Sequence, residues 1–252
     1  MSILIDGKAT ALKIQNELSN KVKELKNINC HPKLVVILVG DDPASKVYVG
    51  HKEKACFKVG IASETILMPS DTSENDLLEK LDELNKDHTV HGILVQLPLP
   101  AQISENKVIE SIVPEKDVDG FHPVNRGKLV SGEDVFLPCT PAGIQYLLKE
   151  YDINPAGKHV VIVGRSNIVG KPLAIMMMQK KEWANSTVTV CHTGSGNLKP
   201  FTSRADILVS AVGRPGTITA DMVKEGAVVI DVGTNRVEDA TRQRGYRLTG
   251  DV

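Results

Sequence analysis

The segment His159-Val-Val-Ile-Val-Gly-Arg-Ser-Asn-Ile-Val-Gly-Lys-Pro172 decides the fold of the second half of the chain. Its β-branched run predicts a buried parallel strand, and Gly164 and Gly170 predict a tight turn into a helix. This arrangement binds phosphate in dinucleotide-binding domains, because free N–H groups at the helix start face the anion. It is no Walker loop: the glycine spacing is one residue too long, and Pro172 replaces the magnesium-binding hydroxyl residue.

Three further strand patterns follow this segment, with helical segments between them. They are Thr187–His192, Ile207–Gly213 and Ala227–Gly233. Strands that alternate with helices predict a doubly wound parallel sheet. Residues 121–252 are therefore expected to form a Rossmann-like nucleotide-binding domain.

The first half of the chain predicts a second α/β domain, over residues 1–120. Lys33–Gly40 is a continuous β-branched run, typical of a parallel strand buried on both faces. An acidic cap before Pro43 starts a helix that should end at Gly60. His91–Pro100 then predicts another short buried strand. We expect an active-site cleft between the two α/β domains.

The loop Pro114-Glu-Lys-Asp-Val-Asp-Gly-Phe-His-Pro123 lies near the midpoint of the chain and is interpreted as the crossover between the domains. Asp119 on this loop would face a cleft in which ligands bind. The alternative is that Asp117 and Asp119 only cap a turn.

Composition excludes several classes of protein. The 252 residues carry a net charge of −1, with 30 cationic and 31 anionic residues interspersed, and 4% are aromatic, which speaks against nucleic-acid binding. The four cysteines are far apart and suggest neither a disulfide framework nor a metal site. The apolar run near the N-terminus is too short for a signal peptide, and no run could span a membrane. We expect a cytoplasmic protein with small-molecule or protein partners.

Two segments of the first domain hold candidate catalytic residues. Tyr48 and Lys52 are four apart on the predicted helix and share a face, but the pattern alone does not distinguish Lys52 from the solvated lysines of this helix. Gln96 is the polar member of a buried strand, at the end where ligands of α/β sheets bind. The alternative is a glutamine that bonds only to loop backbone.

The cofactor is expected to be NADP. The second strand of the nucleotide-binding domain ends at His192 and Thr193, without the carboxylate that would bind the ribose of NAD. Arg165 in the glycine turn, with Thr193 opposite, could bind a 2′-phosphate. The alternative for Arg165 is a surface ion pair.

Six motifs together resemble the family of bifunctional methylenetetrahydrofolate dehydrogenase/cyclohydrolases. They occur in family order and cover nearly the whole chain: Tyr48-Val-Gly-His-Lys52, Gly92-Ile-Leu-Val-Gln-Leu-Pro-Leu-Pro100, Lys116-Asp-Val-Asp-Gly-Phe-His-Pro123, Pro138-Cys-Thr-Pro141, Val163-Gly-Arg-Ser-Asn-Ile-Val-Gly-Lys-Pro172 and Val229-Ile-Asp-Val-Gly-Thr-Asn-Arg236.

The resemblance implies NADP-linked oxidation of 5,10-methylenetetrahydrofolate to the methenyl form and hydrolysis of that form to 10-formyltetrahydrofolate, by a homodimer joined through its nucleotide domains. It implies that Lys52 is the key catalytic residue, that Tyr48 orients it and Gln96 bonds to it, and that Asp119 binds the pterin. The cofactor would contact Gly164, Arg165, Ser166, Thr193 and Thr234.

The chain departs from the family pattern in two places. Thr193-Gly-Ser-Gly196 is neutral where the family usually has a basic residue, which weakens the case for a 2′-phosphate. The family also continues beyond Thr249-Gly-Asp-Val252 with a loop that helps to close the active site and a final helix. Two alternatives therefore stand beside the bifunctional enzyme: a folate- or nucleotide-binding form that is catalytically impaired, and a dehydrogenase without cyclohydrolase activity.

Overall fold

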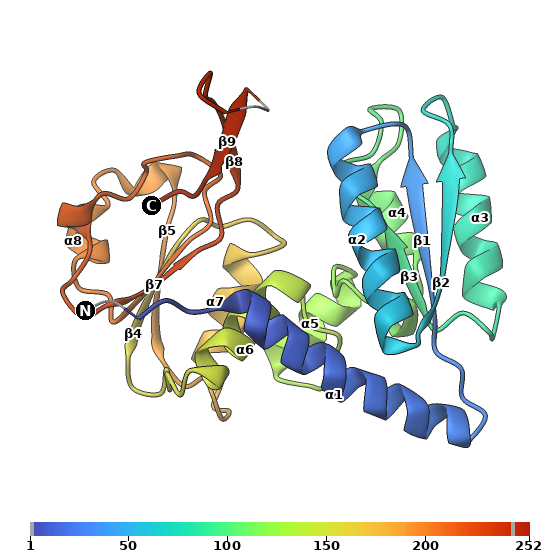
Figure 1. The fold of residues 1–252 in the computed structure, drawn as a ribbon, viewed down its shortest axis with the longest axis horizontal. Helices are drawn as coiled ribbons and strands as arrows, with labels where there is room; N and C mark the ends of the chain where they lie inside the picture. Colours follow the sequence, from blue (N-terminus) through green and yellow to red (C-terminus); the bar gives the residue numbers. More distant parts are fainter. Residues whose placement is uncertain (1–2, 243–244) are drawn as a thin grey trace. The chain divides into compact units, whose positions relative to one another are not determined.

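The computed structural model describes residues 3–242 and 245–252, and its contacts divide the chain into two compact units (Figure 1). The first unit is Met1–Lys128 with Val135–Leu137, and the second is Leu129–Asp134 with Pro138–Val252. Residues 1, 2, 243 and 244 belong to the predicted domains but lie outside the described residues. The division falls after residue 128, whereas the sequence placed the boundary after residue 120.

A three-stranded parallel sheet forms the centre of the first unit. Its order is β2-β1-β3, with the strands β1 (Lys33–Val39), β2 (Ala62–Met68) and β3 (Gly92–Val95). The central strand is buried from Val35 to Val39, as its continuous apolar run predicted.

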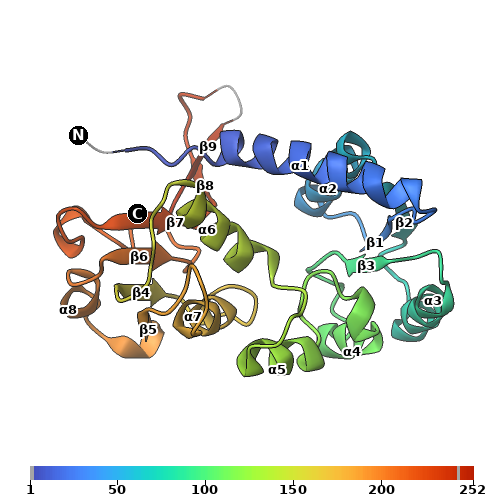
Figure 2. The ribbon, with the colours of Figure 1, turned by 90° about the horizontal axis from the view of Figure 1, so that it is seen from below.

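Helices cover both faces of this sheet. The helical segments of the first half of the chain are α1 (Gly7–Asn27), α2 (Pro43–Val59), α3 (Glu74–Lys86), α4 (Glu105–Ser111), η1 (Pro114–Lys116) and α5 (Pro123–Ser131). Val49 of α2 packs with Val36 and Leu38 of β1, while α3 and α4 bring Leu77 and Val108 to the opposite face. Figure 2 shows the resulting three layers, with α1 packed against α2.

The predicted limits of α2 are confirmed. The Asp42 carboxylate accepts a hydrogen bond of 2.7 Å from the Ser45 N–H, which caps the helix start beside Pro43. Gly60 ends the helix with φ of 84°, a left-handed conformation that glycine adopts without a steric penalty.

The Pro114–Pro123 loop belongs to the first unit and ends shortly before the division after Lys128. Asp117 makes a parallel bridge to Ile93 of β3, next to the sheet edge. The Lys116 ammonium donates to the carbonyl oxygens of Leu84, Asn85 and Asp87, where α3 ends, at 2.7–2.8 Å. A cation at a helix C-terminus satisfies carbonyl groups that have no partner within the helix.

The second unit is built on a four-stranded sheet in which all strands are parallel. Its order is β5-β4-β6-β7, with the strands β4 (His159–Val163), β5 (Thr187–Cys191), β6 (Ile207–Ser210) and β7 (Val228–Asp231). Strand order reverses between β4 and β6, which confirms the predicted doubly wound sheet.

Helices also cover this sheet on both faces (Figure 2). The segments are α6 (Cys139–Glu150), α7 (Gly170–Met178), η2 (Thr193–Ser195), α8 (Lys199–Thr202) and η3 (Ala220–Met222). Long apolar side chains of α7 face β4 and β5, and α6 packs on α7. The helical segment in the connection between β6 and β7 is the single 3-10 turn η3.

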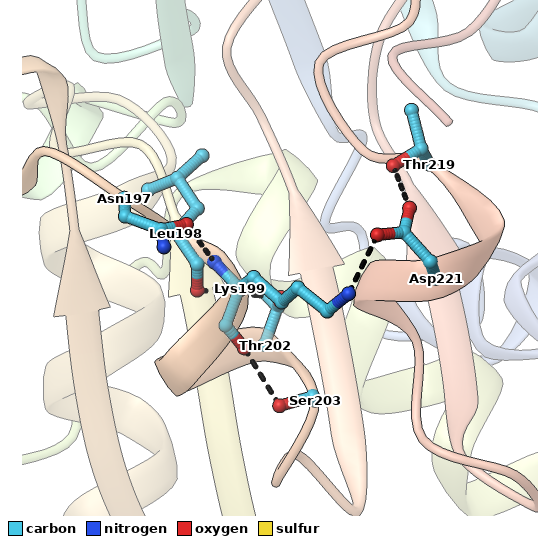
Figure 3. Close-up of polar contacts among 7 residues, drawn as sticks. All are labelled: Asn197, Leu198, Lys199, Thr202, Ser203, Thr219 and Asp221. Carbon is cyan, nitrogen blue, oxygen red and sulfur yellow. Dashed lines mark hydrogen bonds and ion pairs between the residues drawn. The ribbon is translucent and has the colours of Figure 1, made fainter.

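Polar contacts hold α8 and η3 together on their face of the sheet (Figure 3). Lys199 Nζ lies 2.8 Å from Asp221 Oδ2, and the Thr219 hydroxyl donates to Asp221 Oδ1 at 2.6 Å. The Lys199 N–H in turn donates to Asn197 Oδ1 at 3.1 Å. The bonds from the Lys199 ammonium and the Thr219 hydroxyl lower the pKa of Asp221, the Lys199 bond most.

A hairpin that the sequence did not predict follows β7. Its antiparallel strands are β8 (Asn235–Glu238) and β9 (Tyr246–Thr249). The Arg236 guanidinium lies 4.0 Å from the centre of the Tyr246 ring, a cation–π contact across the two strands. None of the helices in the described ranges combines the length and apolar character needed to cross a membrane.

Candidate active site

Helix α2 places Tyr48 and Lys52 one turn apart on its surface. Lys46, Lys54 and Lys58 of the same helix are exposed, but Lys52 is half-buried. Lys46, Lys54 and Lys58 are therefore solvated surface lysines, whereas Lys52 is partly shielded from solvent. Tyr48 is 55% exposed, so its phenol is available to a ligand.

Gln96 lies directly after β3, with both ends of its amide bonded. Its Oε1 accepts a hydrogen bond of 2.9 Å from Lys52 Nζ, and its Nε2 donates to the Leu97 carbonyl at 2.7 Å. The bond to Lys52 that the family resemblance implied is therefore present, and the alternative bond to loop backbone is present as well. The backbone bond orients the amide so that its oxygen faces the amine.

Asp117 and Asp119 differ in their surroundings. Asp117 is 3% exposed, and its carboxylate accepts bonds from the His122 N–H at 2.7 Å and from Asn125 Nδ2 at 2.8 Å. Asp117 thus fits the turn-capping alternative. Asp119 is half-buried and, together with Asp117, Leu97 and apolar side chains of β3 and α4, lines a cavity of about 20 Å³. That volume holds about one water molecule, so a pterin would have to approach Asp119 from outside the cavity.

The glycine turn after β4 requires glycine at both ends. A Cβ on Gly164 would lie 2.4 Å from the Ala211 carbonyl oxygen, and one on Gly170 would lie 2.1 Å from the Gly164 carbonyl oxygen. Gly164 also has φ of 128°, which L-residues rarely adopt. The turn therefore brings backbone N–H groups close together at the start of α7, as phosphate binding requires.

The side chains of this turn have distinct partners. Ser166 Oγ accepts from the N–H groups of Val169 and Gly170 at 3.1 and 3.4 Å, so it stabilises the turn from within. Arg165 is exposed, and its Nη1 lies 3.5 Å from His192 Nε2 at the end of β5. Thr193 follows His192 and is exposed. The structure thus brings Arg165 and the end of β5 together, and no ion pair of Arg165 is seen within residues 3–242 and 245–252.

The turns after β6 and β7 complete the same edge of the sheet. Gly213 has φ of 66°, and a Cβ built there would meet no atom within 4 Å. Thr234 is exposed in the segment between β7 and β8. Open space at Gly213, the N–H groups of the glycine turn and the exposed Arg165 cation fit a dinucleotide with an additional phosphate.

The sequence interpretation missed a buried carboxylate in this unit. Asp251 is 0% exposed, and its side chain accepts bonds from Val212 N–H at 2.8 Å and Arg214 N–H at 2.9 Å. The donors of the turn after β6 are 37 to 39 positions away, so no local pattern could reveal them. The one local signal is Gly250 next to Asp251, because a glycine can mark a place where two backbone segments approach closely.

Two family models match the chain. The model of the tetrahydrofolate dehydrogenase/cyclohydrolase catalytic domain matches residues 5–119, and the model of the NAD(P)-binding domain of the same family matches residues 138–252. The predicted resemblance is thereby confirmed.

Similar proteins cover both units. A bifunctional FolD protein of Halalkalibacterium halodurans is 55% identical over 100% of this chain and 86% of its own length, and one of Chlorobium chlorochromatii is 54% identical over 99% and 86%. The crystal structure of the bifunctional FolD enzyme of Campylobacter jejuni matches with a TM-score of 0.93 at 47% identity, over 99% of this chain and 86% of that one.

A further structure shows which nucleotide a relative binds. The dehydrogenase-cyclohydrolase of Trypanosoma brucei, in complex with NADP and an inhibitor, matches with a TM-score of 0.91 at 36% identity, over 100% of this chain and 85% of that one. From these matches, the chain belongs to the tetrahydrofolate dehydrogenase/cyclohydrolase family and is an enzyme with a catalytic domain and an NAD(P)-binding domain.

Proposed function

We propose that this enzyme oxidises 5,10-methylenetetrahydrofolate to 5,10-methenyltetrahydrofolate with NADP and then hydrolyses the product to 10-formyltetrahydrofolate. The observation that carries this proposal is the bond of 2.9 Å between Lys52 Nζ and Gln96 Oε1 in the catalytic domain. It places an amine beside a neutral acceptor at the carboxyl end of a parallel sheet, where ligands of α/β proteins bind.

Lys52 carries the hydrolysis step in this proposal. Its amine takes a proton from the water that attacks the methenyl carbon, and Gln96 holds the amine toward that water. Tyr48, one turn away on α2 and 55% exposed, lies against the substrate ring and limits the positions open to the Lys52 side chain. Asp119 accepts hydrogen bonds from the N–H groups of the pterin, which an ionised carboxylate does well.

The nucleotide-binding unit holds the cofactor through the turns at the carboxyl ends of β4, β5 and β7. Other backbone N–H groups of the turn after β4 bind the pyrophosphate, because those of Val169 and Gly170 donate to Ser166 Oγ and keep the turn in shape. Arg165 and Thr193 bind the 2′-phosphate, and Thr234 contacts the other end of the cofactor. When bound, NADP supplies a hydride acceptor, and the protein contributes placement of the two reacting rings.

The proposal is tested with the 252-residue chain and methylenetetrahydrofolate. We expect the absorbance of methenyltetrahydrofolate to appear only with NADP. It should then decrease as this product is hydrolysed to 10-formyltetrahydrofolate. Binding of NADP and folate without turnover would contradict it in favour of a binding protein. If the methenyl form accumulates and is hydrolysed only at the uncatalysed rate, the chain is a dehydrogenase without cyclohydrolase activity.

A homodimer joined through the nucleotide-binding units is a further part of the proposal. In this unit β5 is an edge strand, and Val190 on it is 36% exposed, so a partner could cover it. Light scattering after size-exclusion chromatography should give twice the chain mass of 27.3 kDa. A monomeric mass at assay concentration would rule the dimer out.

A cytoplasmic location is supported by Cys56 and Cys191, which are buried and form no disulfide. Burial raises the pKa of the Cys56 and Cys191 thiols, which keeps them protonated and unreactive. Buried thiols that stay reduced fit a reducing compartment. Fractionation of cells that express a tagged chain would test the location.

A further inference from the structure

Asp251 is a buried carboxylate that the proposed mechanism does not use. Its Oδ2 accepts from Val212 N–H at 2.8 Å and Gly213 N–H at 3.2 Å, and its Oδ1 accepts from Arg214 N–H at 2.9 Å. Three successive N–H groups of the turn after β6 thus converge on one side chain. Bonds to an ionised acceptor are stronger than neutral ones, so this carboxylate determines the shape of the turn.

The same residue also holds the segment after β7. Asn235 Nδ2 donates to Asp251 Oδ1 at 2.9 Å, and the Asp251 N–H donates to Asp231 Oδ1 at 3.0 Å. Asp231 Oδ1 accepts from Gly233 N–H at 2.9 Å as well. Asp251 therefore joins the turn after β6 to the segment that contains Thr234.

The backbone around these carboxylates leaves no spare room. A Cβ on Gly233 would lie 2.2 Å from Asp251 Oδ1, and one on Gly250 would lie 1.6 Å from Asp231 Oδ2. Both positions need glycine so that each carboxylate can reach the backbone. The backbone therefore leaves no space for a side chain larger than that of Asp251 at this position.

Asp251 stays ionised in this setting. Burial alone would raise its pKa, but bonds from Asn235 and from the N–H groups of Val212, Gly213 and Arg214 more than offset it and leave the pKa below its usual value. A charged acceptor is thus present at neutral pH.

The two loops lie on one side of the point where the strand order reverses. In a doubly wound sheet the dinucleotide crosses that point, with one nucleotide on each side. The turns after β4 and β5 carry Arg165 and Thr193, so they face the adenosine half with its 2′-phosphate. The turns after β6 and β7 consequently face the nicotinamide half.

We infer that Asp251 is a positioning residue for the nicotinamide half of the cofactor. It holds the turn after β6 and the segment after β7 in the form that receives this half, and its 0% exposure leaves it no surface for direct contact with a ligand. The turn after β6 also packs against the phosphate turn: a Cβ on Gly164 would lie 2.4 Å from the carbonyl oxygen of Ala211, the residue before Val212. A shift of the turn after β6 would therefore also disturb the phosphate turn. The inference rests on the cofactor position proposed above.

The test compares binding of NADP with binding of 2′,5′-ADP, the fragment that lacks the nicotinamide nucleotide, by calorimetry on the full chain. Asp251→Asn turns an acceptor oxygen into an N–H₂ donor that faces backbone donors, so the loops must shift. The Kd for NADP should rise at least about tenfold, and the Kd for 2′,5′-ADP should stay within about twofold. Asn235→Ala leaves the three backbone donors in place. It should also weaken NADP binding more than 2′,5′-ADP binding, but by a smaller factor.

Asp206→Asn is the matched control. Asp206 also accepts a backbone N–H, that of His159 at 2.9 Å, but it lies at the amino end of β6. This variant should keep the ratio of the two Kd values. Equal losses for both ligands, or an unchanged ratio in folded Asp251→Asn or Asn235→Ala, would overturn the inference. Arg165→Ala tests the proposed cofactor position separately. If Arg165 binds the 2′-phosphate, this variant weakens 2′,5′-ADP binding whatever the role of Asp251, and unchanged binding would show that the cofactor position itself is wrong.

Discussion

The side chains of Lys52 and Gln96 are joined by a hydrogen bond of 2.9 Å although they stand 44 positions apart in the chain. One comes from α2 and the other from the residue after β3, so the pair forms only when the helix packs on the sheet. The Leu97 carbonyl holds the glutamine from the other side at 2.7 Å. The amine is thus positioned by the fold of the catalytic unit.

Lys52→Met removes the proposed base while it keeps the length of the side chain. Hydrolysis of methenyltetrahydrofolate should fall by about 100-fold or more, the usual contribution of a general base. Lys54→Met, on an exposed face of the same helix, is the control and should keep its rate. A full rate of hydrolysis in Lys52→Met would remove Lys52 from the mechanism.

Gln96→Leu removes the acceptor of the Lys52 amine with little change in volume. We expect the hydrolysis rate to fall roughly tenfold, because the amine loses the group that aims it. Gln15→Leu is a matched control, since Gln15 of α1 accepts from Lys58 of α2 at 3.3 Å in a second lysine–glutamine pair. Equal rates in the two variants would show that the Lys52 pair has no special role.

Arg165→Ala tests the 2′-phosphate site. Loss of a charge-assisted bond to phosphate should raise the Kd for NADP by about 10- to 100-fold, and the Kd for NAD should change little. Steady-state KM values with each nucleotide provide the comparison. A parallel loss with both nucleotides would place Arg165 at the pyrophosphate instead.

Gly170→Ala tests the tight turn before α7. The new Cβ would lie 2.1 Å from the Gly164 carbonyl oxygen, which is backbone and cannot move aside, so NADP binding should be lost or the unit should unfold at lower temperature. Gly143→Ala in α6 meets no atom within 4 Å and should stabilise the chain by roughly 0.5–1 kcal/mol. Thermal unfolding and calorimetry of both variants give the comparison, and a tolerant Gly170→Ala would refute the tight approach.

Acid should weaken the nucleotide-binding unit through Asp206. The His159 N–H and then the Lys224 ammonium, at 2.9 and 2.5 Å, hold the pKa of this carboxyl below its usual value. Because the folded-state pKa is lowered, the stabilisation is full above the unfolded value of about 3.9 and is lost as the pH falls below it. The unfolding temperature of the native chain should therefore drop more between about pH 5 and 3 than that of Asp206→Asn. Parallel declines would contradict this.

Elements with local signals could be predicted from the sequence. Helix α2 is an example, because the residues that end it, Asp42 and Gly60, are adjacent to it and act through bonds within a few positions. The hairpin β8–β9 was missed, since each of its strands has four residues and no short turn motif joins them. The contacts of the Pro114–Pro123 loop could not be predicted, because they reach α3 and β3, about 30 and 24 positions away.

The candidate site shows the same difference. Strand, glycine turn and helix predicted the nucleotide-binding edge because that motif is contiguous in the chain. Lys52 and Gln96 gained distinct roles only through the family motifs, since their pairing is long-range. Asp251 has no motif of its own, because its donors come from the turn after β6 and from Asn235.

The parallel direction of β4 to β7 also creates an edge that ligands do not use. The turn Ala156–Lys158 lies at the amino end of β4, is exposed, and has no atom within 4 Å of a Cβ on Gly157. A cysteine introduced at Ala156 could carry a fluorophore or a tether at that edge. An enzyme immobilised in this way would keep its nucleotide-facing turns open to solution, which suits single-molecule or biosensor measurements.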